Sequence, residues 1–127
     1  MSAGQSAGET GCSIIIATAA NKDSAKKIAR LLVEKRLAAC AQMFPIESVY
    51  LWQGEICEDS ETALLIKSKT ALFGEIKAAI KEAHSYEVPE IIQIPITNGL
   101  PEYLKWIGDS ATAYSAMACS APAAAQK

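Results

Sequence analysis

Residues 49–54 read Val-Tyr-Leu-Trp-Gln-Gly and contain the strongest strand-and-turn signal in the chain. β-Branched and aromatic residues favour extended backbone, and Gln53-Gly54-Glu55 is typical of a tight turn between antiparallel strands. The extended chain reaches back from this turn to Ala39, and residues 61–69 supply the returning strand. This stretch therefore predicts a long β-hairpin in the middle of the chain, and the rest of the fold is arranged around it.

A strand and a helix precede the hairpin, and a helix and a strand follow it. Residues 13–18 are apolar and β-branched, as in a central strand, and a helix with one apolar stripe is expected from its cap at Asn21 to about Arg36. Thr70 is expected to cap the second helix, and residues 91–96 form the last strand. The order of elements is therefore β-α-β-β-α-β.

This order predicts an α+β fold, a ferredoxin-like sandwich in which two helices cover one face of a four-stranded antiparallel sheet. Pro95 indicates an edge strand or a bulge, because proline has no N–H to donate to a neighbouring strand. Pro101 opens a short C-terminal helix after the last strand.

The hairpin is longer than its own domain can cover. An unbroken strand over residues 39–53 would measure about 50 Å, whereas a domain of this size is about 30 Å across. A bulge or break is expected at Pro45, because proline has no N–H to donate to a neighbouring strand. The hairpin is therefore expected to project beyond the sheet, or to bend at Pro45. A projecting pair of strand edges favours a partner, so we expect an oligomer built by strand addition; the alternative is a hairpin that folds back on its own core.

Composition restricts the function classes. The chain has 127 residues and a mass of 13.5 kDa, which fits one domain over residues 12–110, between a flexible N-terminus over 1–11 and an Ala/Ser-rich tail over 111–127. A net charge of −2 argues against a nucleic-acid partner. No apolar run approaches the roughly 20 residues of a membrane span, and the N-terminus lacks the features of a signal peptide, so a cytoplasmic location is expected.

The sequence offers little for catalysis. It contains one histidine, no Gly-rich phosphate loop and no pair of acidic residues at a diagnostic spacing, so we do not expect an enzyme. An acyl-phosphate hydrolase on this fold would need an anion-binding arginine, and Arg30 and Arg36 both fall on the first helix. The four cysteines form no Cys-x-x-Cys pair, which argues against a zinc ribbon or a redox motif.

A cleft is predicted from side chains that share a face of the hairpin. Glu61 and Lys67 lie on one face of the returning strand, where they suggest an ion pair or a cleft wall. Tyr50 and Trp52 share a face two residues apart and can form an aromatic wall. The polar residues Tyr86 and Glu90 lie further along the chain. These residues indicate either a pocket at a subunit seam or an aromatic-rich interface rim.

His84 is the candidate metal ligand. It lies near the end of the second helix, where the helix dipole favours the protonated imidazole. As a ligand it would need further donors, and Glu61, Glu87 and Glu90 are the candidates. Such a set of nitrogen and oxygen donors suits copper(II), zinc or nickel. The alternative is a polar residue at a helix end or a subunit seam.

Five motifs, in order and at matching spacing over about residues 13–110, resemble the CutA family of divalent-cation tolerance proteins. The resemblance implies a ferredoxin-like homotrimer joined by intersubunit strand pairing, and a role in binding copper or another divalent cation. It makes Cys40 a candidate thiol for a soft metal, although an apolar packed thiol is the alternative. The motifs are Glu34-Lys35-Arg36-Leu37-Ala38-Ala39-Cys40-Ala41, Val49 to Gly54, Leu65-Ile66-Lys67-Ser68-Lys69-Thr70, His84-Ser85-Tyr86-Glu87-Val88-Pro89-Glu90-Ile91 and Tyr103-Leu104-Lys105-Trp106.

The chain departs from the family pattern at its proposed copper ligands. Ala17 stands where the resemblance implies a first-strand cysteine, and Ala83 stands where it implies the first of two histidines, so only His84 remains. Two functions are therefore carried forward. The first is a homotrimeric divalent-cation tolerance protein that binds metal. The second is a trimeric signalling or structural module that binds a small anionic ligand, through Lys67, or a partner protein at its seams.

Overall fold

A computed structural model describes residues 10–113 of the chain. The expected flexible N-terminus and the expected tail lie mainly outside the described residues. At their inner ends, the Thr10 hydroxyl hydrogen-bonds to the carbonyl oxygen of Ile96, and Ala111 and Ala113 are buried in the core. The folded unit therefore takes in a few residues on each side of the range 12–110.

The elements follow the expected order. Strand β1 (Cys12–Ala19) leads to helix α1 (Lys22–Glu34), and strands β2 (Cys40–Trp52) and β3 (Glu55–Lys69) form the hairpin. After β3 come the 3₁₀ turn η1, helix α2, strand β4 and helix α3, which span Thr70–Leu72, Phe73–Ala83, Ile91–Pro95 and Pro101–Ser110 respectively.

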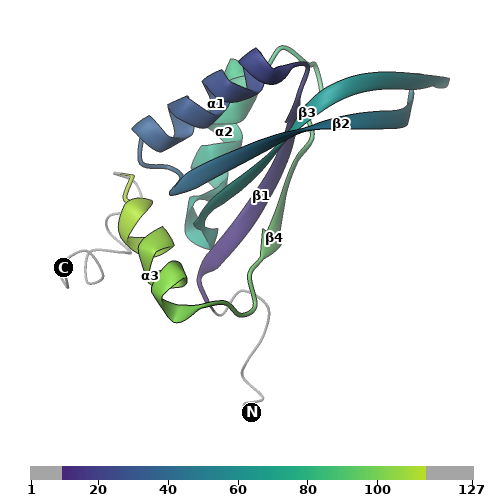
Figure 1. Cartoon of the computed structure of the whole chain (residues 1–127). Coiled ribbons are helices and arrows are strands. Elements are labelled where there is room, and N and C mark those ends of the chain that lie inside the picture. Colours follow the sequence, from purple (N-terminus) through teal and green to yellow (C-terminus); the bar gives the residue numbers. More distant parts are fainter. Residues whose placement is uncertain (1–9, 114–127) are drawn as a thin grey trace.

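The four strands form one antiparallel sheet in the order β2-β3-β1-β4. Helices α1 and α2 lie together on one face of this sheet (Figure 1). Helix α3 lies against one end of the other face, where it contacts Cys12 and Cys40, and the rest of that face has no helix over it. This arrangement confirms the predicted α+β ferredoxin-like fold. β4 is an edge strand, as Pro95 indicated.

The core lies between the sheet and the two helices. Ile15 of β1 and Leu64 and Ile66 of β3 are fully buried, and the apolar stripes of α1 and α2 pack against them. Asn21 caps α1 as predicted, since its side-chain oxygen accepts a hydrogen bond from the backbone N–H of Ser24 at 2.8 Å.

Helix α1 ends in a Schellman motif with arginine at its left-handed position. The N–H of Leu37 donates to the carbonyl of Leu32, and the N–H of Arg36 donates to the carbonyl of Val33. Arg36 has a φ of 61°, a conformation that glycine adopts without strain and that other residues adopt at a cost. The predicted end of the helix near Arg36 is confirmed by this turn.

Two local expectations were wrong. Thr70 does not cap α2: a 3₁₀ turn intervenes, and the Thr70 hydroxyl instead lies 2.7 Å from the hydroxyl of Ser13 on β1. Pro45 does not break β2, which pairs with β3 without interruption from Cys40 to Trp52. β2 is an edge strand, so one side of its backbone has no partner strand, and proline is tolerated there.

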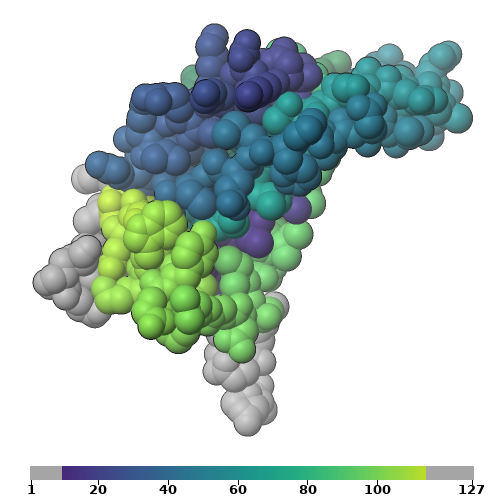
Figure 2. Space-filling model, in the orientation of Figure 1, coloured from purple at the N-terminus to yellow at the C-terminus, as the bar shows by residue number. Residues whose placement is uncertain are grey.

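The hairpin projects from the sheet as a narrow arm (Figures 1 and 2). Its turn places Gln53 and Gly54 at φ values of 52° and 82°, which matches a two-residue turn that requires positive φ at both positions. Apolar side chains on the arm are largely exposed, with Leu51 at 70% and Ile56 at 76% of their maximum accessible surface. The arm therefore does not fold back on the core of its own chain.

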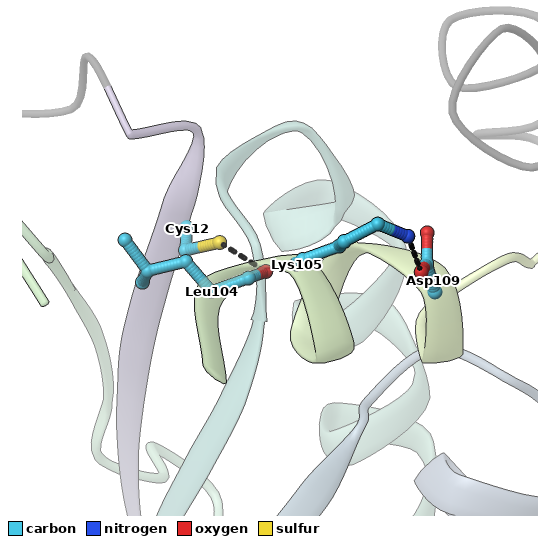
Figure 3. Close-up of polar contacts among 4 residues, drawn as sticks. All are labelled: Cys12, Leu104, Lys105 and Asp109. Carbon is cyan, nitrogen blue, oxygen red and sulfur yellow. Dashed lines mark hydrogen bonds and ion pairs between the residues drawn. The ribbon is translucent and has the colours of Figure 1, made fainter. Parts of the chain in front are cut away.

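Helix α3 begins at Pro101 and packs against the end of the sheet where β1 starts. The Cys12 thiol donates to the carbonyl oxygen of Leu104 at 3.7 Å, and Lys105 forms an ion pair with Asp109 at 2.6 Å along the helix (Figure 3). Burial raises the pKa of the Cys12 thiol. Cys12, Cys40 and Cys57 are free thiols, and Cys119 lies outside the described residues.

Candidate cation-binding groove

A groove of about 750 Å³ lies beside the base of the projecting hairpin. One wall consists of hairpin residues on β2 and β3, and the other consists of residues 86–88 and 90 from the segment that joins α2 to β4, with Thr18 of β1 between them. Figure 1 shows this joining segment passing the base of the hairpin. Three chain segments far apart in sequence therefore form the groove.

The strand register explains which hairpin residues face the groove. Ser48 lies opposite Asp59, and Ile46 lies opposite Glu61, so these four side chains share one face of the hairpin. Tyr50 and Trp52 follow Ser48 on β2 at two-residue spacing and point to the same face. The wall thus combines carboxylates with aromatic rings.

Two tyrosines donate to carboxylates in the groove. The Tyr86 hydroxyl donates to Glu61 Oε2 at 2.9 Å, which links the joining segment to the hairpin, and the Tyr50 hydroxyl donates to Asp59 Oδ2. The hydrogen bond to Asp59 raises the pKa of Tyr50 to about 12. Burial and the hydrogen bond to Glu61 raise the pKa of Tyr86 to about 12. Both hydroxyl protons are therefore held between oxygen atoms, and each phenol oxygen presents only acceptor lone pairs to a ligand.

The charged side chains that line the groove are all acidic. Within the described residues, no lysine, arginine or histidine lines it, and its aromatic side chains are Tyr50, Trp52 and Tyr86. Four carboxylates can face it, those of Asp59, Glu61, Glu87 and Glu90. Glu47 also borders the groove, but its carboxylate accepts from the Ser60 hydroxyl at 2.8 Å on the other face of the hairpin. The groove is therefore suited to a cation and offers no positive group to an anion.

His84 lies outside this groove and both of its ring nitrogens are engaged. Nε2 lies 2.6 Å from the carbonyl oxygen of Thr18, which can only accept, so Nε2 carries the proton. Nδ1 accepts a hydrogen bond from the backbone N–H of Tyr86 at 3.1 Å. Both ring nitrogens of the imidazole are thus engaged in hydrogen bonds to the backbone.

The imidazole instead positions a wall of the groove. Its two hydrogen bonds fix the start of the joining segment to the end of β1, and its ring centroid lies 4.6 Å from that of Tyr86. Tyr86 in turn reaches Glu61. His84 therefore acts on the groove through Tyr86.

The structure brings together four of the five cleft residues predicted from sequence. Trp52, Glu61, Tyr86 and Glu90 line the groove, whereas Lys67 does not: its ammonium group donates to Gln42 Oε1. Glu61 and Lys67 share a face, but six residues of strand separate them by about 20 Å, which is too far for an ion pair.

Cys40 also lies apart from the groove, at the opposite end of β2 from the turn. Its thiol lies 3.8 Å from the hydroxyl of Tyr103 on α3 and is half-buried. Burial, and then the contact with Cys40, raise the pKa of Tyr103. This contact is that of a packed thiol beside an aromatic residue.

Sequence reasoning missed Asp59. It could have been found from its two-residue spacing to Glu61, which places both on one face of an extended strand.

No preformed metal cage exists within residues 10–113: no three His, Cys, Asp or Glu side chains lie close enough together to hold one ion. Ala17 is fully buried and Ala83 is exposed, and neither side chain offers a donor atom. The family's proposed copper ligands are therefore not reproduced at these two positions.

The sheet face opposite α1 and α2 is apolar and continuous with the groove. The register sets Ile16 opposite Ile92 and Ile14 opposite Ile94, and it sets Leu65 beside Ile16. Ile92 and Ile94 are each almost half exposed. Exposed apolar side chains gathered next to an exposed hairpin are typical of interaction surfaces.

Comparisons with known proteins agree with the fold and the motifs. Residues 13–110 match the family described as CutA1 divalent ion tolerance protein. The divalent-cation tolerance protein CutA of Thermus thermophilus is 43% identical over 98 residues, which cover 76% of this chain and 95% of the relative. The chloroplastic CutA protein of Arabidopsis thaliana is 40% identical, over 76% of this chain and 54% of its own length.

Comparison with solved structures also finds members of the CutA family. The structure of the periplasmic divalent cation tolerance protein CutA from Archaeoglobus fulgidus superposes with a TM-score of 0.78 at 40% identity, covering 79% of this chain and 98% of that one. The CutA1 structure from Oryza sativa gives a TM-score of 0.76 at 37% identity, covering 78% and 92%. The family match, the relatives and the shared fold together show that this chain belongs to the CutA family of divalent-cation tolerance proteins.

Proposed function

We propose that this protein is a homotrimer that binds divalent metal ions, copper(II) among them, as cargo rather than for catalysis. The observation that carries the proposal is the lining of the groove, where the carboxylates of Asp59, Glu61, Glu87 and Glu90 gather with no basic side chain among the described residues. Such a site attracts cations, and family membership identifies divalent cations as the class to which the protein responds.

The donors to the metal would be carboxylate oxygens. Glu61 and Asp59 each use one oxygen to accept from a tyrosine, which leaves a second oxygen available to a ligand. A divalent ion can be held by one or two carboxylates with water completing its coordination shell. His84 is not a donor in this scheme, because binding through either nitrogen would break a hydrogen bond that holds the joining segment.

The surfaces left uncovered on the single chain support the proposed trimer. The projecting hairpin offers unpaired backbone along its edge, and the open sheet face offers Ile92 and Ile94. Strand addition between copies would cover both surfaces at once. The groove would then lie at a seam between subunits, because it adjoins both the hairpin and the open face.

An anionic ligand in this groove finds no support in its chemistry. Lys67, the residue expected to hold an anion, lies outside the groove and is hydrogen-bonded to Gln42.

A cytoplasmic location is also part of the proposal. The named relatives include a periplasmic and a chloroplastic protein, so members of the family occur in more than one compartment. Among residues 10–113, no helix is long and apolar enough to cross a bilayer.

Calorimetric titration of the full chain with copper(II) and with zinc tests the proposal. Glu61→Gln and Glu90→Gln each remove one charge from the groove, and Glu82→Gln removes one from the exposed surface of α2 as the matched control. We expect saturable binding that weakens about tenfold in each groove variant and is unchanged in the control. Absence of saturable binding, or equal loss in all three variants, would overturn the proposal.

A further inference from the structure

We propose that Asn98-Gly99 is a site of spontaneous deamidation, a covalent modification that replaces the side-chain amide of Asn98 with a carboxylate. The two residues lie in the segment that joins β4 to α3, and both are exposed. Neither residue lines the groove, so this inference does not depend on the proposed metal site.

The reaction needs no enzyme, and water is its only co-reactant. The backbone nitrogen of Gly99 attacks the side-chain carbonyl carbon of Asn98 and forms a new C–N bond. The C–N bond of the side-chain amide breaks, and ammonia leaves with the proton that the backbone nitrogen has lost. Water then opens the resulting succinimide ring at either carbonyl carbon. One opening gives aspartate, and the other gives isoaspartate, in which the chain runs through the former side chain.

The structure holds the two reacting groups together. The backbone N–H of Gly99 donates to Asn98 Oδ1 at 2.9 Å, and Oδ1 is bonded to the carbon that this nitrogen attacks. The torsion angles of Asn98 therefore already place the nitrogen beside its target. Ring closure then requires a rotation of the side-chain amide rather than a rearrangement of the chain.

The backbone at this site leaves room for the reaction. Residues 96–100 form neither a helix nor a strand, so no helical turn or strand ladder fixes the peptide bond between Asn98 and Gly99. Glycine has no Cβ, so no side chain on residue 99 shields the attacking nitrogen. The pair therefore combines an exposed amide with an accessible backbone nitrogen.

Asn21, the other asparagine of the sequence, provides an internal comparison. Its Oδ1 accepts a hydrogen bond from the backbone N–H of Ser24 at 2.8 Å, as the cap of α1. This bond directs the amide to Ser24 and not to the nitrogen of the following residue, Lys22, which is the first residue of the helix. Deamidation of Asn21 should therefore be slow.

The isoaspartyl product changes the chain where it enters α3. It adds a methylene group to the backbone directly before Gly99, which lies against α3: a Cβ added to Gly99 would lie 3.3 Å from Leu104 Cδ2. The carbonyl oxygen of Leu104 accepts from the thiol of Cys12, which is only 4% exposed. A shift of Gly99 should therefore loosen the part of α3 that covers Cys12.

Storage of the full chain at mildly alkaline pH, followed by peptide mass spectrometry, tests the inference. We expect Asn98 to deamidate at least about tenfold faster than Asn21 and to give isoaspartate as well as aspartate. Asn98→Gln is the matched control, since its longer side chain must close a larger ring, and it should stay unmodified. After storage, iodoacetamide should alkylate Cys12 faster in the unmodified sequence than in Asn98→Gln, whereas Cys57 on the hairpin should react equally in both.

Three outcomes would overturn the modification site. The first is deamidation of Asn98 no faster than that of Asn21. The second is aspartate without isoaspartate, because only the succinimide gives both products. The third is a much slower reaction in the folded protein than in the chain unfolded by urea, because the fold or a neighbouring subunit would then protect the amide. Equal alkylation of Cys12 in the two stored proteins would overturn the effect on α3.

Discussion

The imidazole Nε2 of His84 lies 2.6 Å from the carbonyl oxygen of Thr18, and this contact connects the end of α2 to the end of β1. The second ring nitrogen accepts from the backbone of Tyr86. The only histidine of the chain is thereby a positioning residue for one wall of the groove, and both of its ring nitrogens are engaged in backbone hydrogen bonds.

Replacement of His84 should separate positioning from metal binding. His84→Ala removes a donor and an acceptor, and we expect it to lower the free energy of unfolding by about 2 kcal/mol. His84→Gln carries an N–H donor and a carbonyl acceptor and should recover most of this loss. Chemical denaturation measures the free energy, and calorimetry should show copper(II) affinity in His84→Gln within about twofold of the unmodified protein. Loss of copper binding in a stable His84→Gln protein would show that the imidazole is a ligand.

The tyrosine contacts predict a loss of stability at alkaline pH. The pKa values of Tyr50 and Tyr86 are raised from 10.0 to about 12 in the folded chain. The folded state therefore binds more protons than the unfolded state between these values, so the stabilisation is present below pH 10 and is lost as pH rises through about 12.

An ultraviolet titration of phenolate formation measures this directly. Tyr50, Tyr86 and Tyr103 are expected to ionise later than an ordinary tyrosine, and Tyr86→Phe and Tyr50→Phe should each remove one late ionisation. Ionisation of all the tyrosines near their ordinary pKa in the folded protein would mean that the contacts with Glu61 and Asp59 do not form in solution.

The open sheet face should control assembly. We expect light scattering to give a mass of about three times 13.5 kDa for the unmodified chain. Ile92→Glu places a charge on the open face and should give monomers, because an unpaired charge is strongly unfavourable in an apolar interface. Ala78→Glu places the same charge on the exposed surface of α2 and should leave the trimer intact. A monomeric unmodified protein, or a trimer that tolerates Ile92→Glu, would contradict this assignment.

Replacement of Arg36 by glycine should stabilise the fold. It occupies the left-handed position of the α1 Schellman motif with a φ of 61°, so Arg36→Gly should raise the free energy of unfolding by about 1 kcal/mol. Arg36→Ala keeps the side-chain strain and should bring no gain. Thermal unfolding of the two variants makes the comparison, and equal stability of both would show that the strain is relieved in solution.

The fold could be predicted from sequence because its signals are local. The apolar stripe of α1 and the hairpin turn at Gly54 each fix a short stretch of backbone, and the order of elements leaves one common topology. The two local errors arose because the position in the assembled sheet decides the local structure. Pro45 is tolerated because β2 is an edge strand, and the Thr70 hydroxyl contacts Ser13 of β1 in place of capping α2.

The groove could be predicted only in part because it depends on register. Glu61 and Tyr86 meet only when the joining segment crosses the base of the hairpin, which no local pattern specifies. Lys67 illustrates the converse: sharing a face with Glu61 did not bring the two charges together, because the strand separates them. The spacing of residues in the sequence shows which side chains share a face of a strand. The distances between side chains on different elements can be known only from the assembled sheet.

The most direct test of a cation site in the groove uses the two tryptophans. Trp52 lines the groove and Trp106 lies on α3, so Trp106→Phe leaves a single reporter in the groove and Trp52→Phe leaves one outside it. The measurement is fluorescence during titration with copper(II), which quenches a nearby indole. We predict saturable quenching in Trp106→Phe that is abolished by Glu61→Gln, and none in Trp52→Phe. Saturable quenching of Trp106 alone, or none in either variant, would contradict a cation site in this groove.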